Sequence, residues 1–319
     1  MKARNLTPLL LLATAAIAPI TSSAAEADRC AVVNQSDPGW TDIAATNALS
    51  GVVLNALGYQ QKVQNLSVAL AFQGLKSGQL DVFLGNWMPA QEPVISKFNP
   101  GQDIKVVGAN LPAAKFTLAV PKYVSDAGVK DFADLQKYAD KFGHKIYGIA
   151  PGAPANQNIK KMLDKHDYGL EKWSLVESSE SGMLAQVSRA VSRAVSRKEW
   201  IVFLGWEPHA MNTRFPLTYL SGGDTWFGPN YGSATVNTVT RKDFASDCPN
   251  LNRFFSQLKF DVAVENAVIT RVLDDKQDVN EAARAELAKR PELLGQWLNG
   301  VTSRDGQPAE PAVKKALGL

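Results

Sequence analysis

The sequence predicts an α/β protein of two domains. Two apolar runs, DVFLGNWMP at 81–89 and IVFLGWEPH at 201–209, are typical of buried strands, and each continues into a glycine and a tryptophan. Helical patterns precede both runs, and this alternation favours parallel sheets covered by helices. The chain of 319 residues is also long enough for two hydrophobic cores.

Residues 1–27 are predicted to be a secretory signal peptide. Basic residues precede an apolar stretch at 9–20, and AEA at 25–27 offers a cleavage site of small residues. The alternative is a transmembrane helix, which the short length of the stretch and the interruption by Pro19 disfavour.

The first domain is predicted to follow a β-α-α-β order. It opens with a strand at 31–33, a polar turn, and a helix whose apolar residues at 49–57 repeat every three or four positions. Gly58 stands where a C-terminal cap belongs. Another helix ends near Gly78 and leads into the strand at 82–84.

The second domain is predicted to begin after a break at 110–112. Its strands are expected at 116–121, 146–149 and 201–204. Asn156 is placed to cap a helix with an apolar side, and a further helix spans 183–197.

The chain is expected to cross back to the first domain near residue 230. The segment 222–233 is rich in glycine and aromatic residues, and a strand at 235–240 follows it. The first domain therefore comprises 28–112 together with 230–319, and the second comprises 113–229.

A tandem Ser-Arg-Ala-Val repeat places Arg189, Arg193 and Arg197 on one face of the helix at 183–197. Such a stripe can bind phosphate or lipid, or it can be a solvated face. Three cations are a small footprint in a chain of balanced charge, so we favour the solvated face.

Charge and motif searches exclude several classes of function. The formal net charge of +3 is small for this length and gives no support for nucleic acid as a partner. The three histidines lack metal-ligand spacing, and there is no Gly-x-Ser-x-Gly elbow or phosphate-binding glycine loop. We expect no metal, no cofactor and no enzymatic activity; the alternative is a catalytic triad assembled from residues that lie far apart in the sequence.

Cys30 and Cys248 are the two cysteines of the chain. A pair of cysteines in an exported protein predicts a disulfide. The alternative is two free buried thiols, which an oxidising compartment disfavours. If the bridge forms, the N-terminal strand and the region of Cys248 share one domain.

Three tryptophans are placed to meet at one crevice. Trp40, Trp87 and Trp206 each stand at the end of a predicted strand or just beyond it, where open α/β sheets bind ligands. Aromatic faces around a cleft make a cage for a quaternary ammonium group, with each desolvated contact contributing about 2 kcal/mol. The alternative for any one of them is core packing.

Asp42 and Asn156 each have two compatible roles. Asp42 can cap the helix that follows it, and its carboxylate can also offset the positive end of that helix and attract a cation. Asn156 can cap its helix or offer its amide to a ligand hydroxyl.

Four stretches, PGWTD, DVFLGNWMP, AKFTLAVP and FLGWEPHAMN, resemble in order and spacing the substrate-binding proteins of choline and glycine-betaine ABC importers. The resemblance covers essentially the whole mature chain. It implies a type II Venus-flytrap fold, with two α/β domains joined by two hinge crossings and closing over the ligand. It also implies a periplasmic monomer that binds choline or a related quaternary ammonium ligand and delivers it to an inner-membrane ABC permease.

The resemblance also implies the ligand-binding residues. The family's aromatic box falls on two residues of each domain: Trp40, Trp87, Phe116 and Trp206. Asp42 matches the acidic partner of the trimethylammonium group, and Asn156 matches the residue that holds the choline hydroxyl. Phe116 departs from the tyrosine usual in choline binders, which keeps the π-face and loses a hydroxyl.

Two other functions stay open. A glycine betaine or carnitine receptor has the same fold, but the ligand carboxylate would meet Asp42 unfavourably and no arginine in the matched motifs would pair with it, although a helix N-terminus could hold it. A secreted hydrolase of choline esters belongs to another class, and turnover of such an ester would identify it.

Overall fold

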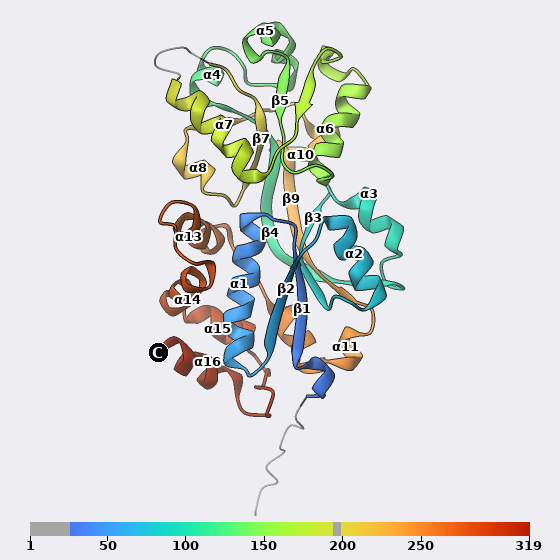
Figure 1. The fold of residues 1–319 in the computed structure, drawn as a ribbon, viewed down its shortest axis with the longest axis vertical. Coiled ribbons are helices and arrows are strands. Elements are labelled where there is room, and N and C mark those ends of the chain that lie inside the picture. Colours follow the sequence, from blue (N-terminus) through green and yellow to red (C-terminus); the bar gives the residue numbers. More distant parts are fainter. Residues whose placement is uncertain (1–25, 194–198) are drawn as a thin grey trace, which may run out of the picture.

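The structure, a computed structural model, describes residues 26–193 and 199–319, which form two lobes along the long axis of the molecule (Figure 1). The first lobe, in the lower half of Figure 1, holds the N-terminal strands and the C-terminal helices, and the second lobe holds the middle of the chain. Apart from Glu26 and Ala27, the predicted leader lies outside the described residues. Within the described ranges no helix is long and apolar enough to cross a membrane.

One mixed sheet runs through both lobes. Its strands are β1 (Val32–Asp37), β2 (Gln60–Asn65), β3 (Val82–Met88), β4 (Ile104–Pro121), β5 (Lys145–Tyr147), β6 (Ser174–Val176), β7 (Phe203–Glu207), β8 (Leu217–Tyr219) and β9 (Ser233–Arg241). Their order is β2-β1-β3-β9-β4-β7-β5-β6, with β8 paired to β4. The predicted parallel pairing holds for β1 with β2 and β3, and for β5 with β6 and β7. The long strands β4 and β9 are antiparallel to their neighbours.

Helices cover both faces of the sheet in the first lobe. They are α1 (Thr41–Ala56), α2 (Val68–Ser77), α3 (Glu92–Ile95), α11 (Phe244–Asp247), α12 (Pro249–Gln257), α13 (Val262–Leu273), α14 (Val279–Lys289), α15 (Glu292–Trp297) and α16 (Ala309–Leu317). In β3, Val82 and Leu84 belong to the core shared with α1, and Phe83 belongs to a separate core under α2. Because β3 buries both faces, its sequence is a continuous apolar run.

The β-α-α-β order predicted for the first domain is wrong, because the structure has the additional strand β2 between α1 and α2. Five of the six residues of QQKVQN are exposed, and the strand lies at the edge of the sheet, parallel to β1. An edge strand that buries neither face has no apolar alternation by which a sequence pattern could reveal it.

The strands β4 and β9 cross between the lobes (Figure 1). β4 is 18 residues long, and its register against β9 shifts three times between Val106 and Ala114. Pro112 lies in this irregular stretch, which suits a residue that cannot donate to a sheet ladder. The predicted break at 110–112 is therefore an irregularity within one strand. The predicted domain limits at 112 and 230 fall inside β4 and just before β9, and they stay a prediction.

The second lobe repeats the strand ending of the first. Its helices are α4 (Lys122–Asp126), α5 (Ala139–Phe142), α6 (Pro154–Asp164), α7 (Glu180–Arg193), α8 (Met211–Arg214), α9 (Asp224–Phe227) and α10 (Pro229–Gly232). Trp87 is the penultimate residue of β3, and Trp206 is the penultimate residue of β7. A cis proline follows each strand, at Pro89 and Pro208. Both strands thus extend further toward their carboxyl ends than the predicted 82–84 and 201–204.

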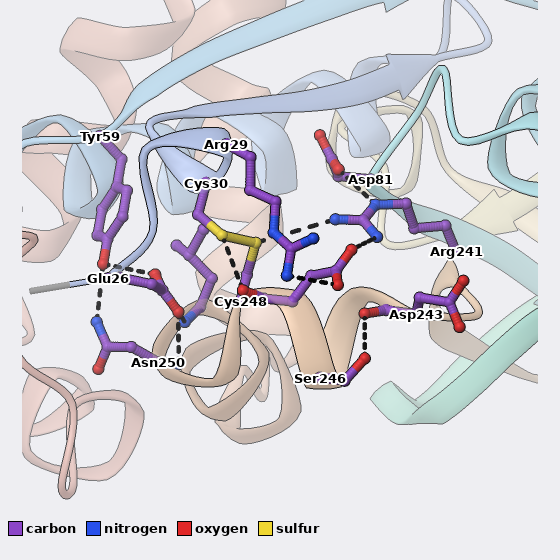
Figure 2. The surroundings of a disulfide bond; sticks show 12 residues. Glu26, Arg29, Cys30, Tyr59, Asp81, Arg241, Asp243, Ser246, Cys248 and Asn250 are labelled. Carbon is purple, nitrogen blue, oxygen red and sulfur yellow. Dashed lines mark hydrogen bonds and ion pairs between the residues drawn. A yellow bond between two sulfur atoms is a disulfide. The ribbon is translucent and has the colours of Figure 1, made fainter.

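The predicted disulfide between Cys30 and Cys248 is confirmed (Figure 2). It joins the start of the described chain to the residue before α12, and both cysteines are buried. Arg241 lies beside the bridge, with ion pairs to Asp81 at 2.9 Å and to Asp247 at 2.6 Å. The disulfide therefore links α12 to the N-terminal strand of the first lobe, so the two regions share one lobe as expected.

Glu26 also belongs to this region, although the predicted leader includes it (Figure 2). Its carboxylate accepts hydrogen bonds from the Tyr59 hydroxyl at 2.8 Å and from the backbone N–H groups of Asn250 and Leu251 at 2.7 and 3.2 Å. These N–H groups lie in the first turn of α12, so Glu26 satisfies donors that lack a partner within the helix. The predicted cleavage after residue 27 would remove this carboxylate.

The arginine stripe of the repeat is only partly described. Arg189 is exposed on α7, whereas Arg197 lies outside the described residues. The choice between a solvated face and a phosphate-binding stripe stays a prediction.

Candidate functional site

A small cavity lies where residues of the two lobes meet. It is lined by Trp40, Asp42, Trp87, Ala90, Gln91, Phe116, Ile149, Pro154, Ala155, Leu204 and Trp206. Five of the six predicted ligand-binding residues are among them, and the exception is Asn156. The lining is apolar apart from Asp42 and Gln91, so a ligand here would be held mainly by aromatic and aliphatic surfaces.

The four aromatic side chains of the lining come from elements of both lobes. Trp40 precedes α1 and Trp87 is the penultimate residue of β3, whereas Phe116 on the crossing strand β4 stands directly opposite Trp206 on β7. The rings of Trp87 and Phe116 are 6.3 Å apart and nearly perpendicular. Three strands of the sheet and the start of α1 thus bring to one cavity residues that lie far apart in the sequence.

Asp42 lies in the first turn of α1, but it does not cap the helix. The N-cap position is Trp40, and no side chain makes a capping hydrogen bond there, so the predicted cap role of Asp42 is wrong. The carboxyl Oδ2 instead accepts a hydrogen bond from Trp87 Nε1 at 3.1 Å. One side chain of the cavity therefore fixes the orientation of another.

The surroundings of Asp42 disfavour its charge. Asp42 is 2 % exposed, and burial, together with the negative charge of Glu180, raises its pKa to about 8, against the effect of the Trp87 hydrogen bond. Glu265 of α13 is also buried, and burial together with the charge of Asp42 raises its pKa. Asp42 is thus largely protonated at neutral pH, and a cation beside it would favour the charged form.

Asn156 is the third residue of α6, whose N-cap position is Ala153, so the predicted cap role is wrong. Its amide Nδ2 donates to the carbonyls of Ile149 and Ala150 and to Glu177, and its Oδ1 accepts from Ile149 N–H at 3.0 Å. The side chain is fully buried. It therefore holds the loop that carries the cavity residue Ile149.

Glu180 is a residue of this region that no sequence motif selects. Its side chain does not line the cavity, and its carboxylate accepts hydrogen bonds from Thr41 N–H at 3.0 Å, from the Thr41 hydroxyl, and from His209 Nε2 at 3.1 Å. Burial by itself raises the pKa of Glu180, but the hydrogen bonds and the interaction with His209 bring it below its ordinary value. A single glutamate at the start of a helix has no recognisable sequence pattern. The one available signal was its partner His209, which belongs to the motif FLGWEPHAMN.

Gln91 is a second lining residue that sequence reasoning missed. Its Nε2 donates to the carbonyl of Gly85 at 2.7 Å, and its Oε1 accepts from Asn86 at 3.2 Å. The side chain is fully buried and belongs to the turn after β3. It therefore fixes the turn that follows Trp87.

Comparison with known proteins gives one family and close structural relatives. Residues 32–289 match the model of the substrate binding domain of ABC-type glycine betaine transport systems. The structure is similar to an ABC-transporter choline binding protein in complex with choline, with 45% sequence identity and a TM-score of 0.88 over 92% of this chain and 100% of that one.

Two curated proteins are also similar to this chain. An uncharacterized protein, ORF1, of Chromohalobacter salexigens is 42% identical over 149 residues, which are 47% of this chain and 94% of that protein. The glycine betaine/carnitine transport binding protein GbuC of Listeria monocytogenes is 28% identical over 172 residues, 52% of this chain and 53% of its own.

Proposed function

The chain belongs to the family of substrate-binding domains of ABC-type glycine betaine transport systems, and on that premise we propose that it is a periplasmic receptor for choline. In this proposal it captures choline between its lobes and delivers it to an inner-membrane permease. The observation that carries the proposal is the cavity itself, where aromatic rings from both lobes surround a space beside one carboxyl group. The similar structure with bound choline supports the same ligand.

The lining suits a trimethylammonium group. Such a cation donates no hydrogen bond, so π-faces and a carboxylate are the groups that recognise it. Four desolvated aromatic contacts of about 2 kcal/mol each amount to roughly 8 kcal/mol before the costs of binding, which is the scale of micromolar affinity. Asn156 stays a proposed partner for the choline hydroxyl, which requires its amide to exchange one of its present partners.

Glycine betaine is the second candidate, and two observations favour it. The raised pKa of Asp42 leaves that carboxyl largely neutral near pH 7, which reduces repulsion of a ligand carboxylate. In addition, α6 begins at the cavity with Pro154 and Ala155, and a helix N-terminus attracts anions. Choline remains our first choice, because no arginine of the described residues lines the cavity to pair with a carboxylate.

Calorimetric titration of the purified mature protein tests the proposal. We expect choline to bind more tightly than glycine betaine, carnitine and acetylcholine. Tighter binding of glycine betaine would favour the second candidate, and binding of none of the four would contradict both. Incubation with a choline ester tests the hydrolase alternative, and we expect no turnover because the family is one of transport proteins.

Asp42→Asn is expected to weaken choline binding by roughly 10-fold or more and to narrow the preference for choline over glycine betaine. The substitution removes a negative charge from a cavity that excludes water, but asparagine keeps an oxygen acceptor for Trp87 Nε1. Titration of both ligands at about pH 9, where Asp42 is ionised, gives the two affinities. An unchanged ratio of affinities would mean that the ligand charge is recognised elsewhere.

The same variant tests the pH dependence. Because the pKa of Asp42 is about 8, choline binding at lower pH must displace a proton, so wild-type affinity should rise between about pH 6 and about pH 8 and then level off. In the ligand-free protein this group contributes stability below its unfolded pKa of about 3.9, and that contribution is lost as the pH rises through about 8. Asp42→Asn should flatten the affinity profile, and an equally steep profile in the variant would assign the titration to another group.

Phe116→Tyr is expected to change choline affinity by less than about fivefold, because the π-face is already present and only a hydroxyl is added. Phe116 is buried between Trp87 and Phe227, with ring centroids 6.3 and 5.6 Å away. Phe227→Leu is a useful comparison, since Phe227 supports this ring from outside the cavity lining. A much larger gain in Phe116→Tyr would show that the hydroxyl itself contacts the ligand.

A further inference from the structure

We propose that Glu180 is a positioning residue that links assembly of the ligand cavity to closure of the two lobes. Glu180 begins α7 in the second lobe, and Thr41 begins α1 in the first. The carboxylate of Glu180 binds both the backbone N–H and the hydroxyl of Thr41. This inference rests on the proposed function and assigns a role to a residue outside the cavity lining.

The partners of Glu180 adjoin the aromatic residues of both lobes. Thr41 stands between Trp40 and Asp42, which both line the cavity. On the other side, the centroid of the His209 ring is 4.8 Å from that of Trp206, and the ring planes are inclined at 67°. One carboxylate therefore connects the backbone that carries two lining residues of the first lobe with the histidine that supports Trp206.

The tautomer of His209 makes it a donor to Glu180. Its Nδ1 accepts a hydrogen bond from Met211 N–H at 2.9 Å, so the proton of the neutral ring lies on Nε2, which faces the carboxylate at 3.1 Å. His209 is fully buried and Glu180 is 6 % exposed. The bond is thus well shielded from water, and shielding strengthens it.

Three donors converge on the two oxygens of Glu180. Thr41 N–H points at Oε2, and the Thr41 hydroxyl and His209 Nε2 point at Oε1. A glutamine amide would place an NH₂ group against Thr41 N–H or against the His209 proton. The site therefore requires a carboxylate, and Glu180→Gln is a nearly isosteric test of it.

We therefore expect the hydrogen bonds between Glu180 and Thr41 to form only when the lobes approach each other. When they separate, Glu180 and Thr41 part, and both exchange this contact for water. Loss of these hydrogen bonds should mainly raise the dissociation rate of the ligand, because a buried hydrogen-bonded charge stabilises the closed state. If Glu180 acted only through its negative charge at a distance, its loss would instead slow the association of a cationic ligand, and this effect would depend on salt.

Stopped-flow binding of choline at two salt concentrations tests the proposal, with glycine betaine used if it binds more tightly. We expect Glu180→Gln to weaken binding by roughly 30-fold or more, mostly through faster dissociation. Thr41→Val leaves the charge in place and removes only the hydroxyl, so it should weaken binding by about fivefold through the same rate. Glu171→Gln removes an exposed carboxylate of the second lobe and is the matched control for charge, with rates near those of wild type.

Small-angle scattering supplies a second readout. The wild type is expected to be more compact than Glu180→Gln, both without ligand and at saturation. Equal compactness of the two proteins in both states, or a loss of affinity confined to a salt-dependent association rate, would overturn the positioning role. If wild type binds none of the quaternary ammonium ligands, the proposed function fails, and the ligand-free scattering still decides the role of Glu180.

Discussion

Trp206→Ala is expected to weaken choline binding by roughly 30-fold, because it removes one desolvated cation–π face of about 2 kcal/mol. Trp87→Ala should weaken binding further. It removes another face and also the indole N–H that donates to Asp42 at 3.1 Å. Calorimetric titration of each variant at one pH and salt concentration measures both effects.

Neither substitution should unfold the protein, since each ring forms part of a cavity wall. Thermal unfolding followed by circular dichroism checks this point. Trp200→Ala is the matched control, because the Trp200 ring packs against Tyr138 and Phe142 in the second lobe and does not line the cavity. Near-wild-type affinity in both Trp87→Ala and Trp206→Ala would refute the aromatic cage.

Loss of the disulfide is expected to have the largest effect on stability. The bridge joins residues separated by 218 positions, and the chain-entropy model gives roughly 5 kcal/mol for closing so long a loop, an upper figure because native strain subtracts from it. We therefore expect the double variant Cys30→Ala with Cys248→Ala to lose about 2–5 kcal/mol of unfolding free energy. Choline affinity should stay unchanged, since neither cysteine lines the cavity.

Urea unfolding of the oxidised protein, the reduced protein and the double variant measures this loss. Arg241→Lys is a useful control, because it weakens the neighbouring ion pairs with Asp81 and Asp247 and leaves the bridge in place. Equal stability of oxidised and reduced protein would contradict the expected contribution. Two alkylatable thiols in periplasm-purified protein would show that the bridge does not form there.

Sequence patterns predicted those elements that bury an apolar face. The strands around Val82 and Phe203 and the helix that ends before Gly58 have such faces, and the structure places them close to where they were expected. The edge strand β2 buries neither face, so its pattern carried no signal. Strand β4 was predicted in pieces, because Pro112 resembles a break when the register shift around it is unknown.

The candidate site was predictable only in part for a similar reason. Motifs identified the four aromatic residues that line the cavity, because large aromatic side chains at strand ends are conspicuous. The partners of polar side chains depend on residues distant in the sequence. Asp42 binds Trp87 and Asn156 binds the loop at Ile149, whereas both looked like local helix caps. Glu180 lies 139 positions from Thr41, and no local pattern could connect them.

The uneven placement of the tryptophans means that the intrinsic fluorescence of the protein should report ligand binding. Of the seven tryptophans, Trp40, Trp87 and Trp206 line the cavity, whereas the other four do not. Indole emission depends on polarity and nearby charge, so a cation that displaces water from the cavity should shift the emission of these three rings against a constant background from the rest. Replacing background residues such as Trp200 by phenylalanine would sharpen the signal, and an unlabelled sample could then report occupancy in real time.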